Sequence, residues 1–311
     1  MHRSILLLAP LFLLAACSSQ RTSVMLDPAL LPLIPGDTIS MGGIRFDAFQ
    51  KTETWKRLAA SPQWSRQMDE FTKEVGFDPR KDLMEILWAS NGKESLFFVR
   101  NRFSQMNIEP LVRREGFQRL AYKGYPLLGD EEFAALFMNA STAVVGRTAR
   151  LRQIIDSRDS GPGNVSKELL AKAETIPASA HLWMVATPAA LPKFEADSAG
   201  TSNMLANLPR LLNGVQYLTI ALDMTSGVDA QAVAYCVDDQ CAKQWQNTIK
   251  GLAGIARITL PEAQRTQMLP LLDSVEVQVN GTSTTTKFKA DLATLERLQS
   301  TFSAEVSRRP N

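Results

Sequence analysis

Hydrophobic residues recur along the chain with two different periods, and each period predicts its own kind of element. In residues 62–75 the apolar side chains are spaced three and four positions apart, which predicts an amphipathic helix. Ser61 and Pro62 are typical of a helix start, and Gly76 is typical of a helix end. The same reasoning predicts helices within residues 46–58, 104–116, 151–155, 166–175, 188–194, 202–212, 239–252 and 262–272, and from 291 onward.

Alternation of apolar and polar residues predicts strands elsewhere, and it is clearest in residues 84–103. Asn91 and Gly92 interrupt this stretch, and because both residues tolerate a positive φ they predict the turn of a β-hairpin. Single strands are expected at residues 38–45 and 181–186, and further hairpins at 117–128, 133–145, 215–237 and 275–290.

A stretch rich in Gly and Pro at residues 157–163 is the best candidate for a boundary within the chain. It divides the body into residues 38–158 and 178–304, with a linker and bridging helix at 159–177 between them. Residues 305–311 are expected to form a tail.

The order of predicted elements is the same in both halves. The hairpins that begin at Met84 and Val215 are offset by 131 residues, and the helices that begin at Ser104 and Asp239 by 135 residues. We therefore predict an α+β fold of two similar lobes that arose by structural duplication. Each lobe is expected to be an antiparallel sheet with helices packed on one face.

The beginning of the chain predicts export. Residues 1–16 are a short charged start followed by an apolar run of about ten residues, too short to span a bilayer, and are typical of a signal peptide. Leu14-Ala15-Ala16-Cys17 resembles the bacterial lipoprotein signal, which implies cleavage before Cys17 and a lipid on its thiol. By the same resemblance, Ser18 after the cysteine favours the outer membrane. The Ser-rich and Pro-rich residues that complete 17–37 predict a short tether.

The body of the chain also carries a resemblance. Gly76-Phe77-Asp78-Pro79, the hairpin after it and Arg102-Phe103 at its end are similar to a family of uncharacterised bacterial lipoproteins and periplasmic proteins. The resemblance extends over residues 38–304 and implies no known activity.

The charge balance argues against one class of partner, and the cysteine content limits the disulfide and metal chemistry that we expect. The chain has 34 Lys and Arg against 32 Asp and Glu, so it lacks the excess of positive charge typical of nucleic-acid binding.

Cys236 and Cys241 are the cysteines that remain beside Cys17. A disulfide between them is the preferred reading in an oxidising compartment, with free thiols as the alternative. Their spacing without a nearby histidine does not fit zinc.

Candidate catalytic residues are sparse. His181 is the one histidine left after signal cleavage, and its place on a predicted strand favours a hydrogen-bonded structural role. Motifs of serine hydrolases, zinc proteases and nucleotide-binding loops are absent from the sequence. The neighbouring acids are Asp130, Glu131 and Glu132, and Asp238 with Asp239, which are typical of turns and helix caps. We expect no catalytic residues, cofactor or metal site.

These observations favour a non-enzymatic lipoprotein that binds or scaffolds another envelope component on the periplasmic face of the outer membrane. Its expected partners are the membrane, through Cys17, and an envelope protein, lipid or cell-wall polymer. One alternative is a carboxylate- or serine-based hydrolase of cell-wall or lipid substrates, which two converging acids with perturbed pKa values in a cleft would support. Another is a carrier of apolar ligands, which a large open apolar cavity would support.

Overall fold

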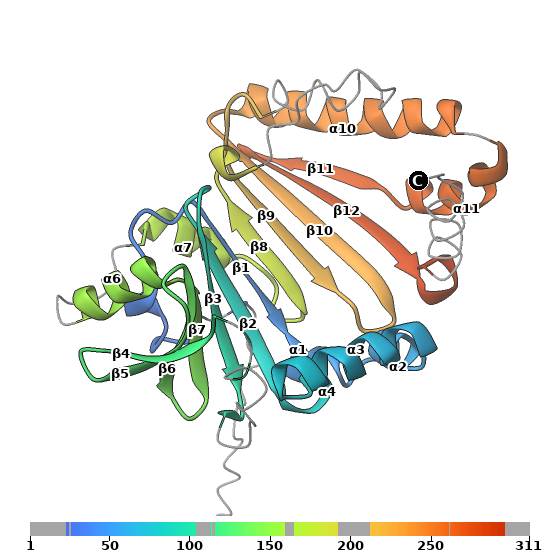
Figure 1. Ribbon diagram of the computed structural model, residues 1–311. Coiled ribbons are helices and arrows are strands. Elements are labelled where there is room, and N and C mark those ends of the chain that lie inside the picture. The colour runs from blue at the N-terminus through green and yellow to red at the C-terminus, as the bar shows by residue number, and fades with distance from the viewer. Residues whose placement is uncertain are drawn as a thin grey trace, which may run out of the picture.

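The computed structural model describes residues 23–24, 26–103, 113, 116–158, 165–191, 212–260 and 262–295. Within them the chain forms one antiparallel sheet of twelve strands flanked by helices, so the predicted α+β class is confirmed (Figure 1). Several predictions lie outside the described residues: the signal peptide, lipidation of Cys17, the helices at 104–116 and 202–212, and the tail.

All of the predicted strands are present, and their ends agree with the prediction or differ by one or two residues. They are β1 (Ser40–Arg45), β2 (Leu83–Ser90), β3 (Ser95–Asn101), β4 (Gln118–Tyr122), β5 (Tyr125–Gly129), β6 (Phe133–Asn139), β7 (Thr142–Arg147), β8 (Leu182–Ala186), β9 (Val215–Asp223), β10 (Gly227–Cys236), β11 (Glu276–Asn280) and β12 (Ser283–Asp291). The helices among the described residues are η1 (Leu31–Leu33), α1 (Phe46–Phe49), α2 (Glu53–Ala59), α3 (Pro62–Val75), α4 (Pro79–Asp82), α6 (Thr148–Arg158), α7 (Lys167–Ala173), η3 (Pro188–Ala190), α10 (Asp239–Thr259) and α11 (Glu262–Asp273).

The two halves share one sheet, which answers a question that the predicted pair of lobes left open. The strand order is β11-β12-β10-β9-β8-β1-β2-β3-β7-β6-β5-β4. β1 and β8 pair antiparallel at the centre, where Gly42 lies opposite Met184 and Gly43 opposite Trp183. Sequence patterns specify each strand but not which distant strand it pairs with, so this joint escaped prediction.

Strand order outward from the joint agrees between the halves. The first half continues as β1-β2-β3-β7-β6 and the second as β8-β9-β10-β12-β11, while the hairpin β5-β4 extends the first half alone. In each half a hairpin follows the central strand, and the last strand of the half pairs beside that hairpin. An origin by duplication stays a prediction.

Helices cover both faces of the sheet, and the prediction of helices on a single face is therefore wrong. Leu151 of α6 and Leu169 of α7 pack in one core with the sheet residues Phe98 and Val144. α10 lies against the opposite face, where the Thr284 hydroxyl of β12 donates a hydrogen bond to the Ala242 carbonyl at 2.7 Å. In Figure 1, α10 crosses the upper ends of β9 to β12, and α1 to α4 gather at the lower end of the sheet.

Residues 26–37 are part of the body, which corrects the prediction of a free tether. Leu30, Leu33 and Ile34 are buried in the same core as α6 and α7. Val24 donates a backbone hydrogen bond to the Ile176 carbonyl at 2.9 Å. The leucines between the prolines therefore pack as core residues, and we call residues 23–37 the N-terminal segment.

Local signals account for most element boundaries. Gly76 ends α3 in the left-handed conformation, with φ of 81°. The first residue of α10 is Asp239, but the side chain that caps the helix belongs to Asp238, which accepts a hydrogen bond from the Cys241 amide at 2.7 Å. The helix therefore begins at the predicted residue, and its capping side chain is the one immediately before it.

Two glycines at the central joint make room for two tryptophans. A Cβ atom on Gly42 would lie 2.1 Å from the Trp88 ring and 2.5 Å from the Trp183 carbonyl oxygen. A Cβ atom on Gly43 would lie 2.7 Å from Trp183 Nε1. Because successive strand residues face opposite sides, the two tryptophans occupy opposite faces of the sheet. Trp183 is among the largest fully buried side chains of the protein.

We expect Gly42→Ala to lower the free energy of unfolding by roughly 2 to 3 kcal/mol, because the added methyl group cannot avoid a backbone carbonyl. The matched control is Gly251→Ala in α10, where an added Cβ atom meets nothing within 4 Å. That variant should gain roughly 0.5 to 1 kcal/mol from helix propensity. Urea unfolding of both variants provides the measurement. A Gly42→Ala protein as stable as the parent would show that the joint is not tightly packed.

Candidate functional site

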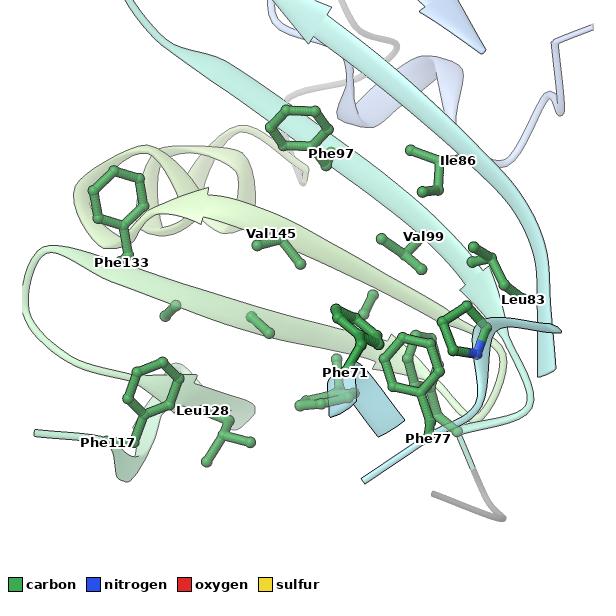
Figure 2. Close-up of a pocket in the computed structure, with 16 residues that line it drawn as sticks. Phe71, Phe77, Leu83, Ile86, Phe97, Val99, Phe117, Leu128, Phe133 and Val145 are labelled. Carbon is green, nitrogen blue, oxygen red and sulfur yellow. The ribbon is translucent and has the colours of Figure 1, made fainter. Parts of the chain in front are cut away.

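An apolar pocket of about 400 Å³ lies on the sheet face of the first half that α3 flanks. Its walls come from β2, β3, β5, β6 and β7, from Phe71 of α3 and from Phe77 and Pro79 after it (Figure 2). Phe103 and Phe117 complete the lining. The volume is within the range of roughly 300 to 1,000 Å³ that is typical of small-molecule sites.

Strand alternation explains why the lining is apolar. Ile86 pairs with Val99, and Val99 pairs with Ala143, so these side chains form one row on the same face. Phe97 and Val145 form the next row. Apart from Glu85 and Arg100 near one end, the opposite face of the same strands is also apolar, because it packs against α6, α7 and the N-terminal segment. These strands are therefore apolar on both faces, although only one face is fully covered by helices.

Aromatic side chains surround the opening of the pocket. The rings of Phe71 and Phe77 meet edge to face with centroids 5.6 Å apart, and those of Phe103 and Phe137 at 5.4 Å. Phe97 is 44% exposed and Phe133 48% exposed. Apolar surface in contact with water costs about 25 cal/mol per Å². An apolar ligand that covered these rings would remove part of that cost.

A cation lies at the rim of the pocket but is already neutralised. The Arg147 guanidinium stands 5.1 Å from the centroid of the Phe133 ring. It also forms ion pairs with Glu94 at 3.3 Å and Glu132 at 3.2 Å. The pocket therefore offers its apolar walls, rather than an unpaired charge, as the basis of recognition.

A polar cleft of about 500 Å³ lies on the other face of the sheet, under the N-terminal segment. Arg45, Glu85 and Arg100 form a row across β1, β2 and β3 and line it together with Asp27 and Asp47. Arg100 pairs with Glu85 at 3.4 Å and with Asp27 at 3.3 Å. Burial raises the pKa of Glu85, while the charge of Arg100 opposes the shift.

His181 has the structural hydrogen bond that the sequence predicts. Its Nδ1 accepts a hydrogen bond from the Met224 amide at 3.0 Å, and its ring lies 6.0 Å from that of Phe49. Burial lowers the pKa of His181, with a contribution from Arg45 and opposition from Asp223. An Nδ1 that accepts a backbone hydrogen bond carries no proton, so the folded protein favours the neutral ring.

Cys236 and Cys241 are paired, with Cα atoms 5.7 Å apart. The bridge links the end of β10 to the first turn of α10. Both cysteines are buried, and a Cβ atom on Gly214 would lie 3.0 Å from the Cys241 sulfur. This environment suits a structural bridge better than an accessible redox centre.

The predicted acidic groups lie in turns and caps. Asp130 accepts hydrogen bonds from the Glu132 and Phe133 amides, and these bonds hold its pKa below the usual value. Glu131 pairs with Arg152 at 3.1 Å. Across the part of the chain that the structure describes, no group of three or more His, Cys, Asp or Glu could hold a metal ion. In the same residues no helix is both long and apolar enough to span a membrane.

Helical spacing in the sequence places Phe71 on the apolar face of an amphipathic helix, but it does not reveal the pocket that this face borders. The available signal was in the strands. Residues 96–99 of β3 and 133–138 of β6 are apolar at consecutive positions, and such runs indicate strands with two apolar faces. The number of helices that cover those faces cannot be read from the strands themselves.

The chain matches no protein-family model and no curated protein. Among solved structures it is similar to two crystal forms of TP0453, a membrane lipoprotein of Treponema pallidum. Crystal form III has a TM-score of 0.52 at 10% identity, covering 89% of this chain and 99% of the other. Crystal form IV has a TM-score of 0.50 at 10% identity, covering 90% and 97%. At this identity the likeness shows a shared fold.

His181 predicts a pH dependence of stability. Its pKa is lower in the folded protein than the unfolded value of about 6.5, so the unfolded chain takes up the proton first as the pH falls. The contribution of His181 is complete above pH ~6.5 and decreases below it. Urea midpoints between pH 7.5 and 5.5 should therefore fall more steeply for the parent than for His181→Asn, whose amide oxygen keeps the acceptor. Parallel profiles would contradict this role.

Proposed function

We propose that this protein is a lipid-anchored component of the bacterial cell envelope that binds an apolar ligand in the pocket beside α3. The ligand class best suited to the pocket is a hydrocarbon chain, such as one acyl chain of a lipid. The role is binding or carriage rather than chemical conversion. The apolar pocket is the observation that carries this proposal.

The anchor is supported by the first residues of the chain. Leu14-Ala15-Ala16-Cys17 follows the apolar run at the spacing of a lipoprotein signal. Two or more acyl chains on one residue suffice for stable attachment, since each buried methylene contributes about 0.8 kcal/mol. Ser18 favours sorting to the outer membrane, with the body on the periplasmic side. The fold shared with a membrane lipoprotein is in keeping with this proposal.

The ligand class follows from what the lining can and cannot do. Hydrocarbon side chains provide nearly all of the walls, so they offer no set of hydrogen bonds that would orient a sugar or a peptide. Burial of methylene groups against Phe97, Val99 and Phe133 is favourable without such bonds. A protein–protein scaffold remains compatible with the anchor, but it does not require an apolar pocket.

A hydrolase is the second candidate, and the polar cleft favours it. Glu85 has a raised pKa and shares the cleft with Asp27 and Asp47, as a general acid and its partner carboxylate would. Against this, Arg100 pairs with both Glu85 and Asp27, which is the arrangement of a structural ion network. The hydrolase would be favoured if the protein released products from peptidoglycan or phospholipid and if Glu85→Gln abolished that release.

Replacement of Cys17 by Ser should move the protein from the outer-membrane fraction to the soluble periplasmic fraction or leave its precursor uncleaved. A thiol can ionise to a nucleophilic thiolate under conditions in which a serine hydroxyl stays protonated. Serine also has no sulfur and therefore cannot form the thioether to diacylglycerol. Fractionation and mass spectrometry of the mature N-terminus provide the measurement. A Cys17→Ser protein that still sediments with the outer membrane would rule out this anchor.

Ligand binding should depend on the free volume of the pocket. Ala135→Trp places a large ring in the pocket and should weaken binding of a fluorescent fatty acid at least tenfold, equivalent to about 1.4 kcal/mol. The matched control is Ala121→Trp on the exposed surface of edge strand β4, which should leave the affinity unchanged. Titration of delipidated, refolded full-length protein gives both constants. Equal affinities in the two variants would place the ligand elsewhere.

A further inference from the structure

The N-terminal segment is fixed to one end of the sheet. Ser23 forms an isolated antiparallel bridge with Pro177, and the Asp27 carboxylate pairs with Arg100 at 3.3 Å. Val24 is 6% exposed, and Leu30 and Ile34 are more deeply buried. The chain therefore enters the body at a defined place, beside the polar cleft.

This docking limits the distance between the body and the membrane. Ser23 follows Cys17 by six residues. A fully extended chain covers at most about 3.6 Å per residue, so Ser23 must lie within about 20 Å of a lipidated Cys17. The argument rests on the lipid anchor of the proposed function. A tether that extended to residue 37 would impose no such limit.

The end of the sheet beside Ser23 carries charges of both signs. Arg45, Glu85 and Arg100 alternate in sign across three adjacent strands. The Asp47 carboxylate is exposed at the same cleft. Two guanidinium groups and three carboxylates line the cleft, so positive charge is not in excess.

We propose that this charged end of the sheet rests on the zwitterionic phospholipid head groups of the membrane that holds Cys17. A phosphate accepts hydrogen bonds from guanidinium groups, and an ammonium group is attracted to carboxylates, so a head group with both charges complements the cleft. Anionic lipids attract clusters of unpaired Lys and Arg. The arginines here are not an unpaired cluster: Nη1 of Arg100 pairs with two carboxylates, and Nη1 of Arg45 donates to the Ala178 carbonyl. Each guanidinium has five N–H donors, so further donors remain on both groups for a phosphate.

The orientation also brings the apolar pocket close to the bilayer. Leu83 and Pro79 line the pocket at the end of β2 from which Glu85 projects to the other face. α4, which contains Pro79, lies at the lower end of the sheet in Figure 1. An acyl chain would then enter the pocket from the membrane side.

The test uses the full lipidated chain in vesicles of equal parts phosphatidylethanolamine and phosphatidylcholine. One fluorophore position is Ala29→Cys, an exposed site beside the cleft, and the matched position is Lys93→Cys, an exposed site in the turn at the opposite end of β2 and β3. β2 has 8 residues and spans about 27 Å. A nitroxide on the lipid head group should therefore quench the label at position 29 severalfold more than the label at position 93.

Each outcome bears on a separate step. Equal quenching, or stronger quenching at position 93, in protein that floats with the vesicles would overturn the orientation and leave the anchor intact. Protein that fails to float would overturn the anchor and this proposal together. Replacement of part of the phosphatidylethanolamine by phosphatidylglycerol should not increase the ratio. A marked increase would mean that the surface recognises anionic lipid and that the head-group class is wrong.

Discussion

The close packing of two tryptophans over Gly42 and Gly43 is the constraint on which the rest of the structure depends. β1 has to approach β8 on one side and β2 on the other, while Trp183 and Trp88 fill the space above and below it. Residues with a Cβ atom at these two positions would push the strands apart. The pairing of β1 with β8 is the contact through which the seven strands of the first half and the five of the second become a single sheet.

The continuous sheet has two faces, and the elements that cover them, as well as the extent of the cover, differ between the faces. On one face the N-terminal segment, α6 and α7 enclose a core that contains Phe98, Leu136 and Trp183. On the other, α10 covers the second half, and Phe71 of α3 reaches only part of the first. The uncovered remainder is the apolar pocket. The charged row and the pocket walls come from alternating residues of the same strands, which is why they lie back to back.

Local chemistry made most of the elements predictable. The Pro62 start and Gly76 end of α3, the turn at Lys123 and Gly124, and the helical spacing in α6 are encoded within a few residues of each feature. Long-range pairing is not encoded in that way, so the joint of β1 and β8 was missed. The burial of Leu30 and Ile34 was missed because prolines dominate that stretch. The pocket was missed because strand patterns reveal apolar faces without revealing which face a helix covers.

The central joint also sets an order of events while the chain is synthesised. The chain emerges from its amino terminus, so β1 pairs with β2 early, while its other edge waits for β8 far later in the sequence. Contacts that close such long loops slow folding and leave an open strand edge in the meantime. A partly synthesised chain therefore exposes the Met41 to Ile44 edge of β1, a segment without charge that could pair with another chain until β8 is available.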